Sequence, residues 1–279
     1  DNIEKIPKVD DKIDLTIVID KKSKSYDASV KMGATDKDKW SQENKNADDY
    51  VYYKLPDTRE GWVLANARLI DMHFNQTNPD KKTKLVLDIS DIRPYGAKIH
   101  GFGGTASGPM PLIEMLFDVN KVINARVGKK LTAVDATDVC NLIGKTVVAG
   151  NVRRSAELAL GSSTDQDFIK MKQDKDKLYH HRWASNNSVA INSKFNDYGP
   201  IADGIKHNGE PGVVNLELSR DYGRIIDGYQ PGIDGDVEGT NPCGEISLAN
   251  GEPCNLFEVF PYVAEQQNWD LKEAFTLAA

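Results

Sequence analysis

Lys84–Ile89 reads KLVLDI and Met110–Ala125 reads MPLIEMLFDVNKVINA, and the contrast between these two stretches decides the fold class. The first is a short apolar run of the kind found in buried strands, whereas the second spaces its apolar residues as a helix does. Leu15–Ile19 (LTIVI) and Glu157–Leu160 match the strand pattern, and Glu60–Phe74 (EGWVLANARLIDMHF) matches the helical one. Strands that alternate with helices predict an α/β fold rather than an all-β fold.

Other elements follow from caps and breakers. Asp57 or Thr58 is expected to cap the helix over residues 60–74, because a short polar side chain accepts a hydrogen bond from a free backbone N–H there. A helix over Ala133–Ala149 is expected to break at Gly144. The lysine-rich stretch after Ile19 predicts a solvated loop. The remaining predictions are a helix at Asp165–Lys172, strands at Ser188–Ile191, Val213–Leu216 and 256–260 (LFEVF), a loop at Arg220–Thr240, and a last helix from about Asp270.

Composition excludes several classes of protein. The 279 residues are 39% apolar and 28% charged, with a formal net charge of −7. No apolar run reaches the roughly 18 residues of a membrane span, and an acidic chain is a poor general ligand for nucleic acid. Three cysteines are too few for a disulfide scaffold and, without a targeting pattern, indicate the cytoplasm. Because the chain starts at Asp1 without Met and stops in what reads as an unfinished helix, we expect a fragment.

The densest polar cluster is Thr240–Glu245, which reads TNPCGE. In an extended strand or loop tip, the side chains of Asn241, Cys243 and Glu245 would share one side. An amide that orients a hydroxyl, a carboxylate that accepts its proton and a thiol between them suit chemistry on a vicinal diol. The alternative is an ordinary turn, because Asn-Pro and Cys-Gly are common loop residues.

The other thiols and imidazoles give weaker signals. Cys254 lies eleven residues after Cys243, and two nearby cytosolic thiols indicate redox or metal chemistry. A zinc site would need further ligands at short spacing, so no metal is predicted. Cys140 lies among apolar residues of a predicted helix and is expected to be a buried core thiol. His180 and His181 are expected on a polar loop, with their rings pointing different ways.

Two further segments are candidates for anion binding. The glycine-rich loop over residues 101–109 (GFGGTASGP) precedes a helix and is able to cradle an anion, or it is a flexible connection. The segment 150–155 (GNVRRS) offers two arginines to a phosphate or to surface carboxylates.

Taken together, these segments resemble the adenosylcobalamin-dependent (class II) ribonucleotide reductases, in particular the monomeric ribonucleoside-triphosphate reductases. The matching segments keep one order along residues 57–261. They are REGWVLANARLID (59–71), IRPYGAKIHGFGGTASGP (92–109), AGNVRRSAELALG (149–161), NGEPGVVNLE (208–217) and NPCGEISLANGEPCNLFEVFP (241–261).

The resemblance implies a fold and a set of residue roles. The family fold is a ten-stranded α/β barrel of two half-barrels, with a finger loop through its centre. By motif, Cys243 matches the thiyl-radical cysteine that abstracts the ribose 3′-hydrogen. Glu245 matches the carboxylate that accepts the 3′-hydroxyl proton, and Asn241 matches the amide that holds the ribose hydroxyls. Cys254 matches one of two cysteines that form a disulfide as the 2′-carbon is reduced.

The same resemblance implies three parts of the chain. Residues 1–85 correspond to the charge-rich part of an effector-binding insertion, within a deoxynucleotide specificity region that spans roughly residues 1–148. Residues 86–240 correspond to the first half-barrel segment, and residues 241–279 to the finger loop and the start of the second half-barrel. Gly104, Thr105 and Ser107 are assigned to substrate binding. His181, Arg182 and Asn186 are assigned to a loop, 179–187, that relays effector identity.

The implied activity is reduction of ribonucleoside triphosphates to deoxyribonucleoside triphosphates, with a thioredoxin-like reductant and a deoxyribonucleotide effector, in a monomer. Most of the adenosylcobalamin site and the partner of Cys254 are expected outside this chain, so the chain alone is expected to be inactive. Glu245 speaks against the glycyl-radical class, and the gap from Cys243 to Cys254 fits class II better than the oxygen-dependent class. The alternatives are an effector-binding module without catalysis and a dimeric class II diphosphate reductase.

Overall fold

The computed structural model describes residues 5–78, 81–99, 104–149, 155–223, 228–255 and 258–278. The chain divides into two compact units, Asp1–Val214 and Asn215–Ala279, called here the first and second units. Parallel sheets with helices between their strands make the first unit a mixed α/β structure, as the sequence predicts.

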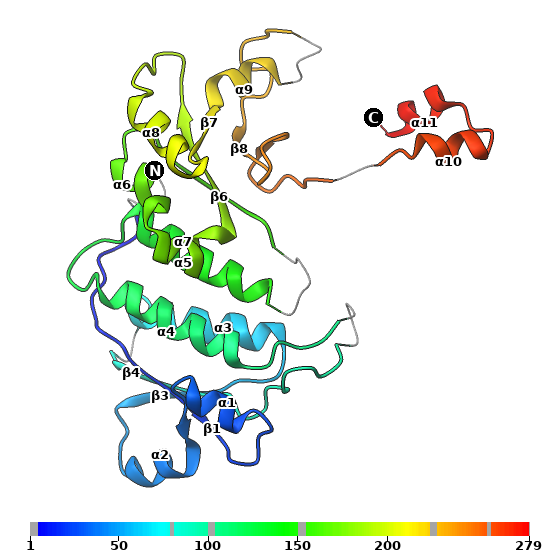
Figure 1. Ribbon diagram of the computed structural model, residues 1–279. Helices are drawn as coiled ribbons and strands as arrows, with labels where there is room; N and C mark the ends of the chain where they lie inside the picture. The colour runs from blue at the N-terminus through cyan, green and yellow to red at the C-terminus, as the bar shows by residue number, and fades with distance from the viewer. Residues whose placement is uncertain are drawn as a thin grey trace. The chain divides into compact units, whose positions relative to one another are not determined.

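A four-stranded sheet organises the N-terminal part of the first unit (Figure 1). Its strands are β1 (Asp14–Ile19), β2 (Thr35–Asp36), β3 (Tyr50–Lys54) and β4 (Lys84–Asp88), in the order β2-β1-β4-β3, and all neighbours are parallel. The central strand β4 is buried from its second residue onward, which explains its continuous apolar sequence. The predicted strands at 15–19 and 84–89 are therefore confirmed.

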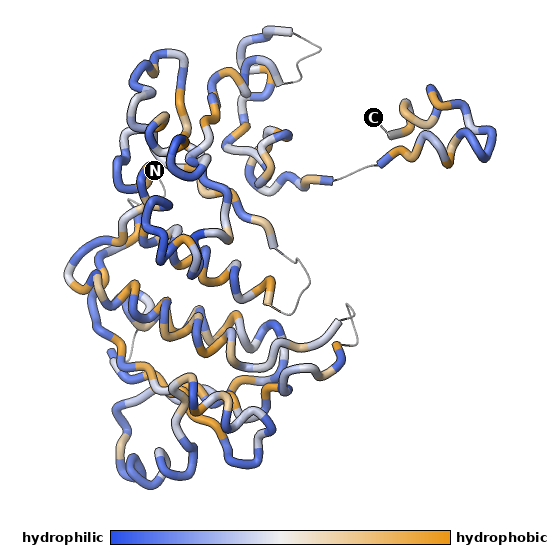
Figure 2. Tube along the Cα trace, viewed as in Figure 1, coloured by the Kyte–Doolittle hydropathy of each residue, from blue (hydrophilic) through white to orange (hydrophobic). Residues whose placement is uncertain are grey.

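Helices cover this sheet and supply most of the core. They are α1 (Tyr26–Lys31), α2 (Lys37–Glu43), α3 (Arg59–Met72), α4 (Met110–Asn124) and α5 (Ala133–Val147). Figure 1 shows α3 and α4 along one side of the sheet, with α5 beyond α4. Figure 2 shows apolar residues concentrated where these strands and helices face one another. Fully buried Leu69, Leu85, Leu87, Leu116 and Val119 belong to this cluster.

A second sheet completes the first unit. It contains β5 (Glu157–Ser162), β6 (Ser185–Ile191) and β7 (Gly212–Asn215) in that order, with β5 and β6 parallel. The connecting helices are α6 (Gln166–Lys170), η2 (Met171–Gln173), α7 (Lys175–His180), η3 (Arg182–Ala184) and α8 (Gly199–Asn208). Buried side chains of α6, η2, β6 and α8 form a smaller core, which consists of Phe168, Ile169, Met171, Val189 and Ile201.

The predicted break of the helix at Gly144 is wrong. The helix α5 runs through Gly144 without a break. A Cβ atom at Gly144 would lie 3.1 Å from a carboxylate oxygen of Glu157 and 3.6 Å from Cβ of Ala184, so this glycine lets other elements approach the helix. The lysine-rich stretch directly after Ile19 is a turn-rich loop over residues 20–25, as predicted, and α1 begins at Tyr26.

The second unit is small and has few buried side chains. Its elements are α9 (Leu216–Tyr222), β8 (Val237–Thr240), β9 (Ser247–Ala249), α10 (Pro261–Gln266) and α11 (Leu271–Ala278). The strands β8 and β9 form an antiparallel hairpin, so the predicted loop over 220–240 is wrong at both of its ends. No strand forms over 258–260, and residues 256–257 of that prediction lie outside the described residues. Within the described residues, no helix is long and apolar enough to cross a membrane.

Candidate functional site

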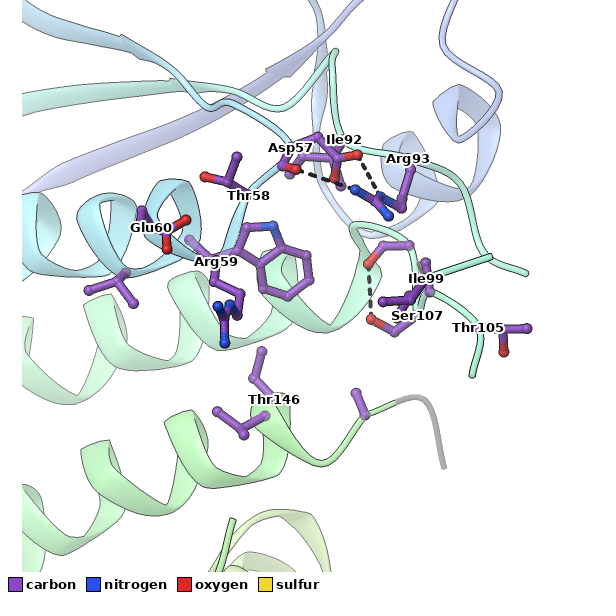
Figure 3. Close-up of a pocket in the computed structure, with 16 residues that line it drawn as sticks. Asp57, Thr58, Arg59, Glu60, Ile92, Arg93, Ile99, Thr105, Ser107 and Thr146 are labelled. Atoms are coloured by element: carbon purple, nitrogen blue, oxygen red, sulfur yellow. Dashed lines mark hydrogen bonds and ion pairs between the residues drawn. The ribbon is translucent and has the colours of Figure 1, made fainter. Parts of the chain in front are cut away.

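A cavity of about 700 Å³ lies in the first unit between the start of α3, the loop after β4 and the end of α5 (Figure 3). Its size is typical of small-molecule sites. Thr58, Arg59 and Trp62 line it from α3, and Thr146 lines it from α5. Figure 3 shows the Arg59 side chain extending from the start of α3 toward Thr146. The mixture of an aromatic face, cationic groups and hydroxyls suits a ligand with a planar apolar part and an anionic part.

The start of α3 is fixed by local sequence. Thr58 is the N-cap, and its Oγ1 accepts a hydrogen bond from the N–H of Gly61 at 3.0 Å, as the cap prediction requires. A Cβ atom at Gly61 would lie 2.5 Å from the carbonyl oxygen of Pro56, so only glycine fits where the chain enters the helix. The resulting first turn of α3 lies in the cavity wall.

An ion pair joins the loop after β4 to the start of α3. Arg93 Nε lies 2.6 Å from Asp57 Oδ2 (Figure 3), and Arg93 Nη2 donates to the Asp57 carbonyl oxygen at 3.5 Å. Because both side chains are partly exposed, the pair contributes little to stability but fixes the geometry of this wall.

The glycine-rich loop supplies another wall. Ala106 N–H donates to Ala97 O at 2.8 Å, and Gly96 N–H donates back to Ala106 O at 2.9 Å, which closes the loop into a hairpin-like turn. Thr105 and Ser107, predicted to bind substrate, both line the cavity, and Gly104 adjoins Thr105 with φ +81°. Residues 101–103 of this motif, and 150–154 of the arginine motif, lie outside the described residues.

The Asn-Pro-Cys-Gly-Glu motif lies at the tip of the β8–β9 hairpin in the second unit. Asn241 is 4% exposed, and its backbone N–H donates to Ile246 O at 3.0 Å. Its Oδ1 accepts from Ile246 N–H at 3.0 Å, and its Nδ2 donates to Cys254 Sγ at 3.5 Å. The amide therefore closes the turn and holds the second thiol beside it. The structure thus brings together Asn241 and Cys254, which lie 13 residues apart in sequence.

The two reactive groups of this motif project from the tip. Cys243 is a free, exposed thiol, and Glu245 is also exposed. Gly244 between them has φ +87°, a conformation that glycine adopts easily. The motif is thus a turn, as one interpretation of the sequence predicts. Asn241 is buried in it while Cys243 and Glu245 are exposed, so the three side chains do not share one environment, and their chemical roles stay a prediction. Cys140, predicted to be buried, has an exposed side chain on α5; partial desolvation of its thiol and the nearby Glu157 carboxylate raise its pKa.

The predicted relay loop is tightly held. Arg182 Nε and Nη2 donate to the two carboxylate oxygens of Asp138 at 2.6 and 2.7 Å, and His181 Nε2 lies 2.9 Å from Asp138 Oδ1. Burial alone would raise the pKa of Asp138, but the hydrogen bonds from Arg182 and His181 outweigh it and lower that pKa to about 2. Asn186 lies in β6 and is exposed.

Among the described residues, one group of potential metal ligands is close together, with ligand atoms of Glu114, Asp118 and His180 within 4.8 Å. Lys145 Nζ lies 2.8 Å from Glu114 Oε1 and already supplies a counter-charge, so we describe this group as an ion-pair network. The rings of His180 and His181 do not point apart as predicted, because their Nδ1 atoms lie 3.1 Å from each other.

Sequence reasoning missed most of the cavity. The sequence predicts Trp62 only as a helix residue and Thr58 only as a possible cap, and it gives Arg59 no role beyond the family motif. Arg93 and Thr146 carried no signal of their own, because their place in one wall depends on how three separate segments pack. The sequence signal that could have indicated this cavity is a polar cap residue close to an aromatic residue at the start of a helix.

Comparisons with known proteins agree with one another. Residues 13–123 match the family model described as "B12-dependent ribonucleotide reductase, insertion domain". The adenosylcobalamin-dependent ribonucleoside-triphosphate reductase of Lactobacillus acidophilus is 84% identical over 99% of this chain. The reductase of the same name from Lactobacillus leichmannii is 73% identical over the whole chain. The chain spans 37% of the length of each of these two relatives.

A solved structure gives the same result for the fold. The crystal structure of a B-12 dependent (class II) ribonucleotide reductase superimposes on 99% of this chain with a TM-score of 0.89 and 71% sequence identity. The match covers 38% of the crystallised chain. The sequence resemblance is therefore confirmed, and the chain is similar along almost its whole length to one segment of the adenosylcobalamin-dependent ribonucleoside-triphosphate reductases.

Proposed function

We propose that this chain is the part of an adenosylcobalamin-dependent ribonucleoside-triphosphate reductase that binds the specificity effector and carries the radical thiol. The observation that carries the proposal is 84% identity to such a reductase over 99% of the chain. The product, a deoxyribonucleoside triphosphate, would serve DNA synthesis.

Residue roles are assigned to the β8–β9 hairpin. Cys243, at the exposed tip, is the thiol that carries the radical and removes the ribose 3′-hydrogen. Glu245 accepts the proton of the 3′-hydroxyl, which requires its ionised form. Cys254 supplies one of the two thiols that are oxidised to a disulfide while the 2′-carbon is reduced and water leaves. A radical thiol needs a site closed to water, so the exposed tip would have to insert into an enclosing cavity.

The role of Asn241 follows from its contacts. Its Oδ1 is engaged by Ile246 N–H, and its Nδ2 points to Cys254 Sγ. We infer that this amide both supports the turn and, once substrate is bound, holds a ribose hydroxyl near Cys243. The barrel assignment is part of the same proposal: the β5–β6–β7 sheet belongs to a ten-stranded barrel, and residues 241–279 form its finger loop and the start of the second half-barrel.

The relatives' names support adenosylcobalamin as the cofactor, which supplies the radical when bound. Among the described residues, the cavity of about 700 Å³ is of nucleotide size and far too small for a corrin with its appended groups. The residues present therefore do not fit this cofactor, and we assign none of them to it. The reductant is proposed to be thioredoxin-like, and the protein a cytoplasmic monomer.

The cavity is proposed to bind the deoxyribonucleotide effector. Trp62 offers a face for the base, while the positive charge of Arg59 and the positive end of the α3 dipole attract phosphate. Thr105 and Ser107, assigned to substrate by the resemblance, line this same cavity and would contact the effector there. His181 and Arg182 are bound to Asp138, so a relay role would operate through the position of the loop 179–187 rather than by direct contact.

The test of activity uses a complete enzyme. This chain replaces the matching segment of the L. acidophilus reductase, and the hybrid is assayed with adenosylcobalamin and a dithiol. We expect ribonucleoside-triphosphate reduction and 3′-hydrogen exchange, whereas the chain alone should show neither. Cys243→Ser should abolish the exchange but keep effector binding, and the exposed Cys140→Ser is the matched control. Exchange that survives Cys243→Ser would overturn the radical assignment.

Effector binding is tested on the chain itself by equilibrium dialysis with deoxyribonucleoside triphosphates. Trp62→Ala should weaken binding by about ten- to a hundredfold, because base–aromatic stacking contributes about 1–3 kcal/mol. Trp269→Ala, at an exposed tryptophan of the second unit, should leave binding unchanged. If the hybrid enzyme is inactive but dialysis shows binding, the alternative function, an effector-binding module without catalysis, is supported instead.

A further inference from the structure

Two backbone groups at the start of β6 are bound by an ion pair rather than by a neighbouring strand. Lys172 Nζ donates to the carbonyl oxygen of Ser185 and lies 2.5 Å from Glu210 Oε2. Glu210 Oε1 accepts a hydrogen bond from the N–H of Asn187 at 3.3 Å. A strand directs the C=O of one residue and the N–H of the second residue after it to the same edge. The ion pair therefore lies along one edge of β6.

This edge is the one that β7 covers farther along the strand. β5 lies on the other edge of β6, and β7 begins only at Gly212. A Cβ atom at Gly212 would lie 2.7 Å from Ser188 Oγ and 3.8 Å from the carbonyl oxygen of Asn187, so β7 reaches β6 just beyond residues 185–187. The ion pair thus continues the hydrogen bonding of the sheet where β7 has not yet begun.

An ion pair in this position adds little stability by itself. The side chain of Lys172 is 7% exposed, so its ammonium loses most of its hydration, while that of Glu210 is 26% exposed. The desolvation cost of a buried pair offsets much of its Coulomb attraction, and apolar residues of similar volume often stabilise a protein equally well. Apolar residues cannot supply the donor and the acceptor that the two backbone groups of β6 need. What the pair determines is therefore the geometry of residues 185–187.

That geometry fixes the end of the loop 179–187. Ser185 and Asn187 are 2% and 3% exposed, and Ser185 Oγ donates to Asn187 Oδ1 at 2.8 Å. Asn187 Nδ2 also donates to Met171 Sδ at 3.2 Å, directly before Lys172 in the chain. Side chains alternate along a strand, so holding residues 185 and 187 inward turns Asn186 outward, where it is exposed.

The first half of the same loop is held by a different element. Arg182 is bound to Asp138 of α5, the helix whose Thr146 lines the cavity. The loop is therefore attached to α5 in its first half, and to η2 and the turn before β7 at its end. Because the two attachments belong to different elements, a shift of α5 would turn the loop about the attachment at Lys172 and Glu210.

We propose that Lys172 and Glu210 are positioning residues that set the orientation of Asn186, and through it the substrate preference that a bound effector selects. This inference rests on the proposed function, in which the loop 179–187 relays effector identity. Neither residue has to touch effector or substrate. Their loss should therefore change substrate selection without changing effector affinity or the radical step.

Amide exchange in the 279-residue chain tests the attachment. Glu210→Ala should speed exchange of the Asn187 N–H at least about tenfold, because its acceptor is lost. Lys172→Glu combined with Glu210→Lys should speed it similarly, because an ammonium does not accept from an N–H and a carboxylate does not donate to a carbonyl. Protection restored by this charge reversal would indicate a general ion pair and overturn the proposal. Lys175→Met, at an exposed lysine of α7, is the matched control and should change nothing.

The hybrid reductase tests the consequence for substrate selection. The measured quantity is the ratio of kcat/KM for two ribonucleoside triphosphates, determined with each of two deoxyribonucleotide effectors. Glu210→Ala should reduce the effector-dependent change in this ratio by about tenfold, mainly through KM. Effector binding in dialysis and 3′-hydrogen exchange should persist. Ile201→Val, in the same small core, is the control for a general loss of stability and should keep the preference.

The outcomes separate this inference from the proposed function. A wild-type hybrid without effector-dependent preference would overturn the proposed function and this inference with it. A wild-type hybrid with such a preference, which Glu210→Ala leaves intact, would overturn the inference alone. If Glu210→Ala does not fold, Lys172→Met takes its place; it leaves the Ser185 carbonyl without its donor and should cause the same loss of preference.

Discussion

The side-chain amide of Asn241 donates to the thiol of Cys254 across 3.5 Å, while its oxygen accepts from the backbone of Ile246. One buried amide thus fixes both the turn that presents Cys243 and the position of a second thiol. A single side chain therefore contacts Cys254 and supports the turn that carries Cys243.

Removal of that amide should loosen the hairpin. We expect Asn241→Ala to destabilise the turn by about 1 kcal/mol, because the partly buried N–H of Ile246 loses its partner. The measurement is amide exchange at Ile246, together with the rate at which Cys254 reacts with iodoacetamide; both should increase. Asn250→Ala, at an exposed position after β9, should change neither.

Asp138 should make the chain sensitive to acid. Its pKa falls from 3.8 to about 2 in the folded state, so its stabilising effect is complete above about pH 5 and is lost as the pH falls through 4 toward 2. The contribution amounts to about 2 kcal/mol. Urea unfolding at pH 7 and pH 3 should show Asp138→Asn losing about 3–5 kcal/mol at neutral pH, since Arg182 is left buried without its partner. An equal loss at both pH values would contradict this account.

Gly161 should not tolerate a side chain. A Cβ atom there would overlap the ring of Phe168, which is 2% exposed in the second core. We expect Gly161→Ala to lower the free energy of unfolding by about 1–3 kcal/mol through overpacking. Gly199→Ala is the control, because its Cβ would meet nothing closer than 3.6 Å at the start of α8. Thermal unfolding should separate the two variants clearly.

Asp88 holds together the carboxyl end of the first sheet. The carboxylate accepts from Lys37 Nζ at 2.8 Å, from Tyr52 Oη at 2.6 Å and from Ser90 N–H at 3.0 Å. Burial opposes its ionisation, but these bonds lower its pKa overall. Asp88→Asn should cost about 3 kcal/mol, and Tyr52→Phe about 1 kcal/mol, in chemical denaturation. A larger loss for Tyr52→Phe than for Asp88→Asn would contradict the central role of the carboxylate.

All three thiols should react in the native state. Cys140, Cys243 and Cys254 are free and exposed, so an aromatic disulfide reagent should modify three thiols per chain without denaturant, with Cys140 the slowest because its raised pKa leaves less thiolate. Cys140→Ser should reduce that number to two. No modification of Cys140 in the native state, even at a pH high enough to ionise it, would contradict its exposed position.

Local sequence determined much of the first unit. Apolar runs such as Lys84–Ile89 have a strand's length and composition, and the cap at Thr58 needs only its own neighbours, so both could be predicted. The hairpin at Thr240–Glu245 was also marked by its turn residues. Its chemical roles came from the resemblance to a family, which local physics alone does not provide.

Packing between distant segments decided the rest. Gly144 reads as a helix breaker, but it is a contact point for Glu157 and Ala184, and only the folded chain brings these residues to it. The exposure of Cys140 on α5 is likewise set by which segments pack against that helix. The cavity at Trp62 combines residues from three segments, which no periodicity reveals.

The pair of adjacent histidines shows this division most directly. Because the two histidines are adjacent in the sequence, their imidazoles lie close together in any fold, but adjacency does not determine which other groups they contact. Only the packing of α7 against α4 and α5 placed Asp138 at one end of the pair and Glu114 and Asp118 at the other. The sequence by itself therefore determined the elements, the caps and the reactive residue types, whereas the tertiary structure decided their protonation, exposure and common sites, because these depend on neighbours far away along the chain.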